Sequence, residues 1–525
     1  MTRKTWALGP LLLLMGVSAG CGPQQWTPSI VGSQHPPPPS SERPFLKAHL
    51  HSGELAVFTV WAVPQEGDDV LEGRGTRFSV GREVIQNGPI SLPLDSVALL
   101  ESNRRETVDR FAFSGLTVYT GLTVLVTAAC VSDPKSCFGS CPTFYVDEGE
   151  SDRLVAEGFS SSVARVFEDH DLDALPIPDS GGESYSLLMR NEAPETHAVR
   201  WLHLLAVPRP RDGFVYATPD GHFLEGSKAY EPSACLGGPR PGTTPCLDLL
   251  RHSDGREYFR PSDSLDLAAR EVVELEFPDS GSAQRLGLLI RGRASLLSTF
   301  LFYQTLAYVG EDAGLWLAAL ERGNPELADR VMGLPRAVGN VEVFLDRGGS
   351  WEKVGAFGEA GPIASDEQVL PLPAGVEGPF RVRLRMAQGA WRIDRVGLVR
   401  LGSEVEARVL HPKAVNTVSG GVSGEVALNR LLDPDKYLVT QQGDAFEVRF
   451  ILPGDRREMA LFLDSRGYYY EWMREEWVRE TNPGMATLIL SNPEEALRRM
   501  APDFKAMESG MEETFWASRF RRNQP

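Results

Sequence analysis

Two pairs of cysteines lie close enough in the sequence to form local disulfides. Cys235 and Cys246 bracket a stretch rich in glycine and proline, so a bridge between them would close an irregular loop. Cys137 and Cys141 lie in the run K-S-C-F-G-S-C-P, where Gly139 permits a tight turn and the proline that follows disfavours a continuing helix. We therefore expect a disulfide within each pair if the chain reaches an oxidising compartment.

Cys130 is left over if the two pairs form, and its neighbours in the sequence are apolar. We expect it to be a buried free thiol, and the alternative is a bridge to Cys137 or Cys141. A zinc site is not expected, because structural zinc sites use two closely spaced ligand pairs and Cys235 lies too far from Cys246 for such a pair.

Three alternating aspartates, Asp169, Asp171 and Asp173, imitate the start of a calcium-binding loop. An EF-hand also needs glycine at its sixth position and glutamate at its twelfth, whereas this chain has Ala174 and Ser180 there. The sequence therefore predicts a solvated acidic turn.

No pattern typical of an enzyme active site occurs in the strand-to-helix context that such a site needs. This holds for H-E-x-x-H, G-x-S-x-G and G-x-x-x-x-G-K-[ST]. Ser132 and Lys135 match S-x-x-K, but Pro134 disfavours the helical turn that this motif needs. His49 and His51 could point to one face of a strand, yet no third ligand is evident. The sequence therefore assigns no catalytic residue, no metal ligand and no cofactor.

Trp351 and Trp391 are the candidate ligand-binding residues. Each lies in a region of alternating apolar residues that is typical of strands. An exposed indole there could stack on a sugar, and the alternative is that both tryptophans belong to the core.

The first twenty residues have the layout of a signal peptide. A short basic region is followed by an apolar run, Trp6 to Val17, that is too short to span a bilayer, and by the small residues Ser18 to Gly20. Cys21 comes next. This order resembles the bacterial lipobox, in which a lipidated cysteine becomes the first residue of the mature protein. The resemblance implies acylation of Cys21, and the alternative is an ordinary secretory signal with an incidental cysteine.

Residues 21–44 are rich in proline, serine and glutamine, which predicts an extended tether between the lipid and a folded body. Gly22 stands where inner-membrane lipoproteins of enterobacteria carry aspartate. This favours the outer membrane of a bacterial cell envelope as the destination.

The formal net charge of -18 argues against nucleic acid as a partner, because no basic patch is evident to offset the repulsion. The partners that we expect are the membrane, through the N-terminal lipid, and an envelope protein or glycan.

The body of the chain predicts a mainly β fold with helical insertions, built from β-sandwich or jelly-roll modules and a helical C-terminal segment. We expect a small β-domain at 45–180, which includes the uncharged segment 111–132, either a buried hairpin or helix or a membrane-inserted helix. A β-sandwich-like domain with a helical hairpin at 296–322 should occupy 181–335, a second sandwich or jelly-roll portion 336–465, and a helical segment 466–525. Apolar residues at helical spacing predict that this last segment docks on the body, and the alternative is that it binds a partner.

Three stretches resemble segments of bacterial envelope lipoproteins to which no activity is assigned. They are P-K-S-C-F-G-S-C-P-T-F-Y-V at 134–146, R-N-E-A-P-E-T-H at 190–197, and G-Y-Y-Y-E-W-M-R-E-E-W from Gly467. The resemblance implies an envelope location and a modular β-rich architecture, and it transfers no reaction and no catalytic residue.

The leading hypothesis is a membrane-anchored envelope lipoprotein with a non-enzymatic binding or structural role. One alternative is an envelope hydrolase whose Asp, Glu and His side chains come together only in the fold. A second alternative is a carbohydrate-binding surface protein. The sequence favours a non-enzymatic role without deciding the question.

Overall fold

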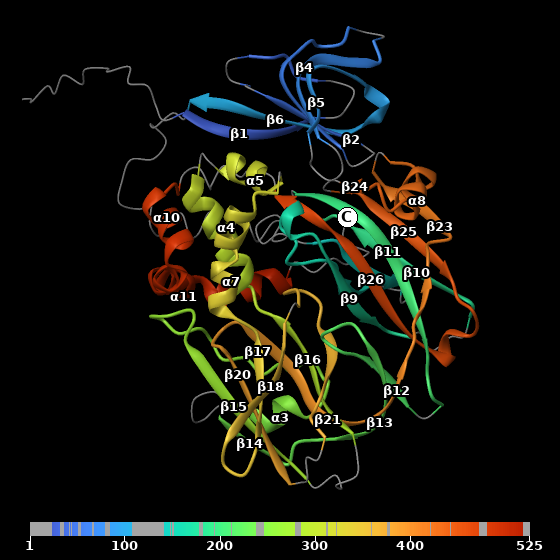
Figure 1. Ribbon diagram of the computed structural model, residues 1–525, viewed down its shortest axis with the longest axis vertical. Helices are drawn as coiled ribbons and strands as arrows, with labels where there is room; N and C mark the ends of the chain where they lie inside the picture. Colours follow the sequence, from blue (N-terminus) through green and yellow to red (C-terminus); the bar gives the residue numbers. More distant parts are fainter. Residues whose placement is uncertain are drawn as a thin grey trace, which may run out of the picture.

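The structure is a computed structural model. It describes residues 24–31, 36–40, 43, 45–50, 54–65, 68–78, 84–107, 141–147, 149, 152–177, 182–193, 195–211, 213–237, 246–278, 285–310, 313–321, 323–358, 360–374, 379–420, 422–440, 443–471 and 480–517. The predictions for Cys21, His51, Cys130, Cys137 and segment 111–132 fall outside these residues. Figure 1 shows an N-terminal sheet above a body that consists of a sandwich, a barrel with its own covering sheet, and a layer of helices.

The N-terminal sheet has six antiparallel strands in the order β1-β6-β2-β3-β4-β5. The strands are β1 (Gln24–Val31), β2 (Leu46–Leu50), β3 (Leu55–Trp61), β4 (Val70–Phe78), β5 (Val84–Pro93) and β6 (Val97–Thr107), with a 3-10 turn η1 (Leu94–Ser96) before β6. Its buried apolar side chains, among them Phe58, Leu71 and Leu92, form a core that, within the described residues, contains side chains of this sheet and its turn η1 only.

Strand β1 corrects the expectation of a tether at 21–44. Gln24–Val31 pair with β6 along their whole length, from Gln24 opposite Thr107 to Val31 opposite Leu100. Because β1 is an edge strand, Pro28 can occupy it although proline lacks an N–H group. Further along, the carbonyl of Pro37 accepts a hydrogen bond from Nε1 of Trp61 at 2.7 Å. Part of the proline run therefore lies against the sheet.

Two five-stranded sheets form a β-sandwich. The first has the order β23-β25-β10-β7-β8 and the second the order β22-β11-β26-β9, with β24 also paired to β11. Their strands are β7 (Thr143–Asp147), β8 (Asp152–Glu157), β9 (Asp169–Leu175), β10 (Ser184–Arg190), β11 (Glu195–Pro208), β22 (Arg408–Leu410), β23 (Ala414–Ser419), β24 (Leu438–Thr440), β25 (Ala445–Ile451) and β26 (Met459–Glu471). Side chains of both sheets, such as Phe144, Leu204 and Phe446, share one core. Helix α8 (Gly424–Leu432) lies beside this sandwich, and Ser423 caps its first turn.

A closed barrel, β12-β13-β21-β16-β19, is covered by a sheet in the order β14-β15-β20-β17-β18. The barrel strands are β12 (Phe214–Ala217), β13 (Phe223–Tyr230), β16 (Leu286–Ala294), β19 (Asp366–Pro371) and β21 (Trp391–Val405); the covering strands are β14 (Ala234–Gly237), β15 (Arg270–Phe277), β17 (Val341–Asp346), β18 (Trp351–Phe357) and β20 (Phe380–Ala387). Val341, Val343 and Leu345 alternate inward along β17, and they share a core with residues of the barrel.

The helices gather on one side of the body, with those of residues 297–338 against those of the C-terminal segment (Figure 1, yellow and red). They are α4 (Leu297–Val309), α5 (Ala313–Glu321), α6 (Pro325–Val331), α7 (Gly333–Val338), α10 (Pro483–Ser491) and α11 (Pro493–Ala517). Phe504 of α11 packs on Phe300 of α4 with ring centroids 4.9 Å apart, so the C-terminal helix docks on the body as predicted. Among the described residues, no helix combines the length and apolar character needed to cross a bilayer.

The predicted fold class, mainly β with helical insertions, is confirmed. Two further local expectations are wrong. Tyr468 and Tyr469 lie on strand β26 instead of starting a helix, because they pair with β11 in antiparallel register. Asp173 lies on strand β9 and is buried, so the aspartate run is not a solvated turn. The sandwich also joins strands from 143–208 with strands from 408–471, segments that the sequence treats as separate domains.

Candidate functional site

A cavity of about 340 Å³ lies where the sandwich, the barrel and the helical layer meet. Helices α4 and α7 supply much of its wall through apolar side chains such as Leu301, Leu306 and Val338. Trp391, the first residue of β21, contributes from the barrel side, and Tyr469 of β26 from the sandwich. This size and this mostly apolar lining are typical of pockets for small organic molecules.

Cys141 and Glu157 form the polar end of the cavity. Cys141 lies just before β7, and Glu157 is the last residue of β8, which pairs with β7. The Cys141 thiol donates a hydrogen bond to the Glu157 carboxyl. Oε2 of Glu157 also accepts from the backbone N–H of Ile363 at 2.8 Å. A Cβ at Gly361 would collide with the same oxygen, so this glycine is what allows the chain to close over the carboxyl.

Burial governs the protonation of both groups. It raises the pKa of Glu157 to about 7, against the opposing effect of the hydrogen bond from Ile363. Burial, followed by the charges of Glu157 and Glu195, raises the pKa of Cys141 well above its usual value. Near neutral pH the thiol therefore keeps its proton, while Glu157 can take up or release one.

A buried polar network continues from this end of the cavity into the sandwich. Nε2 of His197 lies 2.9 Å from Oε1 of Glu195, and both side chains are buried. Oε2 of Glu192 accepts hydrogen bonds of 2.7 Å from Oγ1 of Thr143 and from the hydroxyl of Tyr145. These contacts satisfy polar groups that would be costly to bury alone.

Two tyrosines connect the network to the cavity wall. The Tyr303 hydroxyl, on α4, donates to the Glu471 carboxyl at the end of β26. The Tyr469 hydroxyl donates to the carbonyl of Ser160 at 3.1 Å. Tyr303, Tyr469 and Ser160 all line the cavity. The hydrogen bond of Tyr303 joins α4 to the sandwich, and that of Tyr469 links β26 to the segment after β8.

The three sequence stretches that carry the lipoprotein resemblance meet in this region. Antiparallel pairing places Arg190 of β10 opposite Thr143 of β7, and Glu195 of β11 opposite Glu471 of β26. The stretches contribute Cys141, Thr143 and Tyr145; Glu192, Glu195 and His197; and Tyr469 and Glu471. The fold thus brings residues from three distant segments together, and two of them, Cys141 and Tyr469, line the cavity.

The cysteine predictions have different outcomes. Cys235 of β14 and Cys246, the first residue of α3 (Cys246–Leu250), form the predicted disulfide. Cys141 is a buried free cysteine, so the expected bridge to Cys137 is wrong. The physical reason is that the Cys141 thiol faces inward and donates to Glu157.

The two candidate tryptophans lie in different sheets and do not form a common site. Trp391 lines the cavity, and its buried Nε1 donor has no hydrogen-bond partner among the described residues. Trp351 lies on β18, away from the cavity, and the guanidinium carbon of Arg383 is 4.0 Å from its ring centroid. Carbohydrate binding by either indole stays a prediction.

Glu157 and Tyr303 are residues of the site that the sequence did not reveal. Neither belongs to a motif, and Glu157 acquires its environment from residues 361–364, some two hundred positions further along the chain. For Tyr469 the sequence offers one indication, the aromatic run from Gly467, but this run predicts a helix.

In the described part of the chain, no three His, Cys, Asp or Glu side chains come together as metal ligands would.

No protein-family model, curated protein or solved structure matches the chain. The resemblance to envelope lipoproteins therefore stays an expectation, and the case for a function depends on the geometry above.

Proposed function

We propose that the chain is a membrane-anchored lipoprotein of the bacterial envelope whose body binds a small, largely apolar ligand in the cavity at the junction of its three parts. The observation that carries the binding role is the cavity itself, with its mostly apolar walls and the polar groups of Cys141 and Glu157 among its lining. The anchor depends on the sequence pattern around Cys21.

The electrostatics favour an uncharged or weakly polar ligand. A carboxyl with a pKa of about 7 can donate a hydrogen bond when protonated and accept one when ionised, so it suits a hydroxyl or carbonyl group. A cavity wall of leucine, valine and aromatic side chains would not compensate the desolvation of a charged ligand body.

Envelope hydrolysis is the second candidate, because a carboxyl whose pKa is near neutral is suited to general acid–base catalysis. The Cys141 thiol argues against a nucleophilic role, since its raised pKa keeps it protonated and the thiolate is the reactive form. Hydrolysis of a chromogenic ester or glycoside by the purified protein, lost in Glu157→Gln, would favour this candidate over simple binding.

The binding role is tested with the uncharged fluorophore N-phenyl-1-naphthylamine. We expect a saturable rise in fluorescence with one site per chain. Ser298 is an exposed residue of α4 at the cavity, so Ser298→Trp should obstruct entry and weaken the binding by about tenfold or more. Thr487→Trp is the matched control, because Thr487 is an exposed helical hydroxyl residue outside the cavity. Absence of saturable binding, or equal weakening by both variants, would overturn the binding role.

The anchor is tested by intact-mass analysis of membrane-extracted protein. We expect the mature chain to begin at an acylated Cys21, and Cys21→Ala to move the protein into the soluble fraction. If Cys21→Ala stayed on the membrane, lipid anchoring would be contradicted. The proposed ligand binding in the cavity would not be affected by that result.

A further inference from the structure

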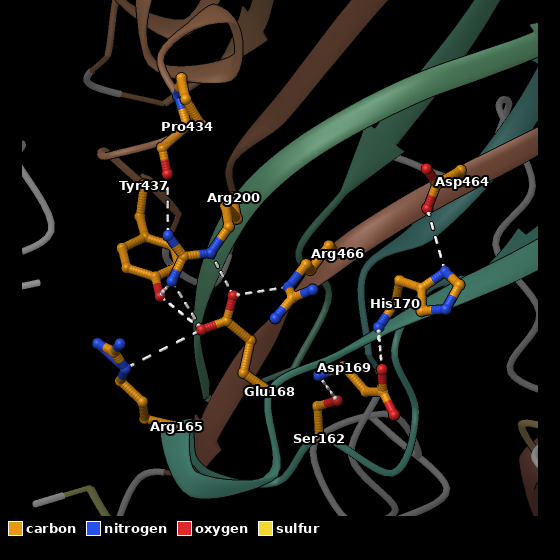
Figure 2. A network of polar contacts seen from close by, with 10 residues as sticks. All are labelled: Ser162, Arg165, Glu168, Asp169, His170, Arg200, Pro434, Tyr437, Asp464 and Arg466. Carbon is orange, nitrogen blue, oxygen red and sulfur yellow. Dashed lines mark hydrogen bonds and ion pairs between the residues drawn. The ribbon is translucent and has the colours of Figure 1, made fainter. Parts of the chain in front are cut away.

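One carboxylate in the sandwich is surrounded by three arginines, as Figure 2 shows. We call this group the Glu168 cluster; its members are Glu168, Arg165, Arg200, Arg466 and Tyr437. The residues come from the 3-10 turn η3 (Arg165–Phe167) and the position after it, from β11, from β26, and from the position before β24. None of the five lines the cavity, so the cluster is independent of the proposed function.

Arg200 is aimed at Glu168 by an irregularity of strand β11. Val199 pairs with Gly467 and Trp201 with Arg466, which leaves Arg200 as the extra residue of a β-bulge. Bulges redirect side chains and are frequent beside functional sites. Arg200 contacts Glu168 through Nε and through Nη2, the latter at 2.8 Å, and its Nη1 donates to the carbonyl of Pro434 at 2.9 Å. All three guanidinium nitrogens of Arg200 are therefore engaged.

Arg165 and Arg466 are engaged much less. Nε of Arg466 donates to Oε1 of Glu168 at 3.2 Å. Among the described residues, Arg466 contacts no other carboxylate. Nε of Arg165 lies 4.0 Å from Oε2 of Glu168, and its buried Nη1 has no hydrogen-bond partner in the described part of the chain. Among the described residues, both arginines thus keep donors that no acceptor uses, beside an acid to which Arg200 and Tyr437 also donate.

The charges of the cluster do not balance. Burial opposes ionisation of Glu168, but hydrogen bonds from Arg200 and Tyr437 outweigh it and lower the pKa, so this carboxyl carries one negative charge. Three guanidinium groups face it, so the cluster as defined holds two more positive than negative charges in a protein of net charge -18. Asp464, the acid two residues before Arg466, is shared with His170 and His203 at 3.6 and 3.5 Å.

Solvent reaches the arginines but not the acid. The exposed fractions of the side chains are 17% for Arg165, 15% for Arg200 and 35% for Arg466, against 7% for Glu168. An anion from solvent therefore meets the arginines, Arg466 above all, before it meets the carboxylate, in a setting that water screens only in part.

We propose that the Glu168 cluster binds a phosphate group, held by Arg165 and Arg466, with Arg200 fixed behind them by its pairing with Glu168. A phosphate fits better than a second carboxylate, because its additional oxygens can accept from two guanidinium groups that approach from different elements. The phosphate could be free in solution or part of a lipid headgroup, and the experiment distinguishes the two sources.

The test is calorimetric titration with inorganic phosphate at constant ionic strength. We expect saturable binding that Arg466→Gln and Arg165→Gln each weaken by about tenfold, as for the loss of one charge-assisted hydrogen bond. Arg457→Gln is the control, since Arg457 is 61% exposed and forms its ion pair with Asp455 elsewhere. Absence of phosphate binding, or equal binding of acetate, would overturn the proposal.

A charge variant separates binding from a purely structural role. Glu168→Gln removes the negative charge of the cluster, so phosphate should bind several-fold more tightly than to the unaltered protein. A structural ion-pair network predicts lower stability and no gain in phosphate affinity, and that result would also overturn the proposal. Sedimentation with phosphatidylcholine vesicles, with and without phosphatidic acid, identifies the source of the phosphate group. Selective retention by vesicles that contain phosphatidic acid, abolished by Arg466→Gln, supports a lipid headgroup. Phosphate binding without retention on vesicles supports a soluble phosphate.

Discussion

Glu157 is a carboxyl group that folding has moved from water into the interior. Because its pKa rises from 4.5 to about 7, the folded protein binds this proton more tightly than the unfolded chain does. The stability that this difference contributes is fully present below pH 4.5 and is lost as the pH rises through 7. One such shift corresponds to roughly 3 kcal/mol in the free energy of unfolding.

The direction of this pH dependence predicts how the variant Glu157→Gln behaves. A glutamine cannot ionise, so the variant should lose less stability than the unaltered protein between pH 5 and pH 8. Urea denaturation at the two pH values measures the difference. Glu406→Gln serves as control because Glu406 is exposed. Identical pH dependence in all three proteins would show that Glu157 is not buried as described.

Cys141 should behave as a protected thiol. It is buried, and its pKa is raised by burial and by the charges of Glu157 and Glu195, so both access and thiolate formation are disfavoured. We expect iodoacetamide to leave the Cys141 peptide unmodified in the native protein and to alkylate it in denaturant without prior reduction. Mass spectrometry of the peptide checks both states. A requirement for a reductant would instead restore the bridge to Cys137.

At the scale of elements, the Cys235–Cys246 disulfide fastens β14 to α3. It closes a loop of sequence separation 11, for which loss of chain entropy in the unfolded state is worth about 3 kcal/mol. The double variant Cys235→Ala/Cys246→Ala should therefore lower the melting temperature of the barrel and its covering sheet. Calorimetry with and without reductant provides the check: a reductant should lower this transition in the unaltered protein and leave the same transition unchanged in the double variant.

Helix α11 depends on a few apolar side chains for its docking. Phe504 is buried against Phe300, and Leu497 and Met500 lie on the same buried face. Phe504→Ala should cost about 3 to 5 kcal/mol and release the C-terminal helix to proteases. Asp503→Ala changes the exposed neighbour and should leave cleavage unchanged. Equal protease sensitivity of both variants would contradict the docking.

The elements also show where sequence reasoning succeeds. Strand β17 was predictable because Val341, Val343 and Leu345 alternate with polar residues, a pattern that one buried face imposes locally. The strand at Tyr468 was not predictable, because aromatic residues are compatible with both helix and strand. Here the pairing with β11 determines that the segment is a strand. The sequence motif around Cys141 was enough to single out this residue. Glu157 could not be singled out, because residues far along the chain form its environment.

At the scale of the whole molecule, the cavity exists because the chain leaves the sandwich and returns to it. Strands β7 to β11 precede the barrel in the sequence, and strands β22 to β26 follow it and complete the same two sheets. The barrel and helices α4 to α7 are thereby inserted against the sandwich, and the cavity lies at their common border. Local periodicity contains no information about such long-range closure, which is why domain boundaries drawn along the sequence cut through the sheets.

The N-terminal sheet stands outside this arrangement, because its buried side chains pack on one another. We therefore expect it to unfold in a transition separate from that of the body. Leu71→Ala removes a fully buried side chain of this sheet and should shift one calorimetric transition, with a cost of about 2 to 5 kcal/mol. Leu384→Ala, equally buried under the barrel, should shift the other. If either substitution moved both transitions together, the sheet and the body would form one cooperative unit, and its core would have to extend beyond β1 to β6.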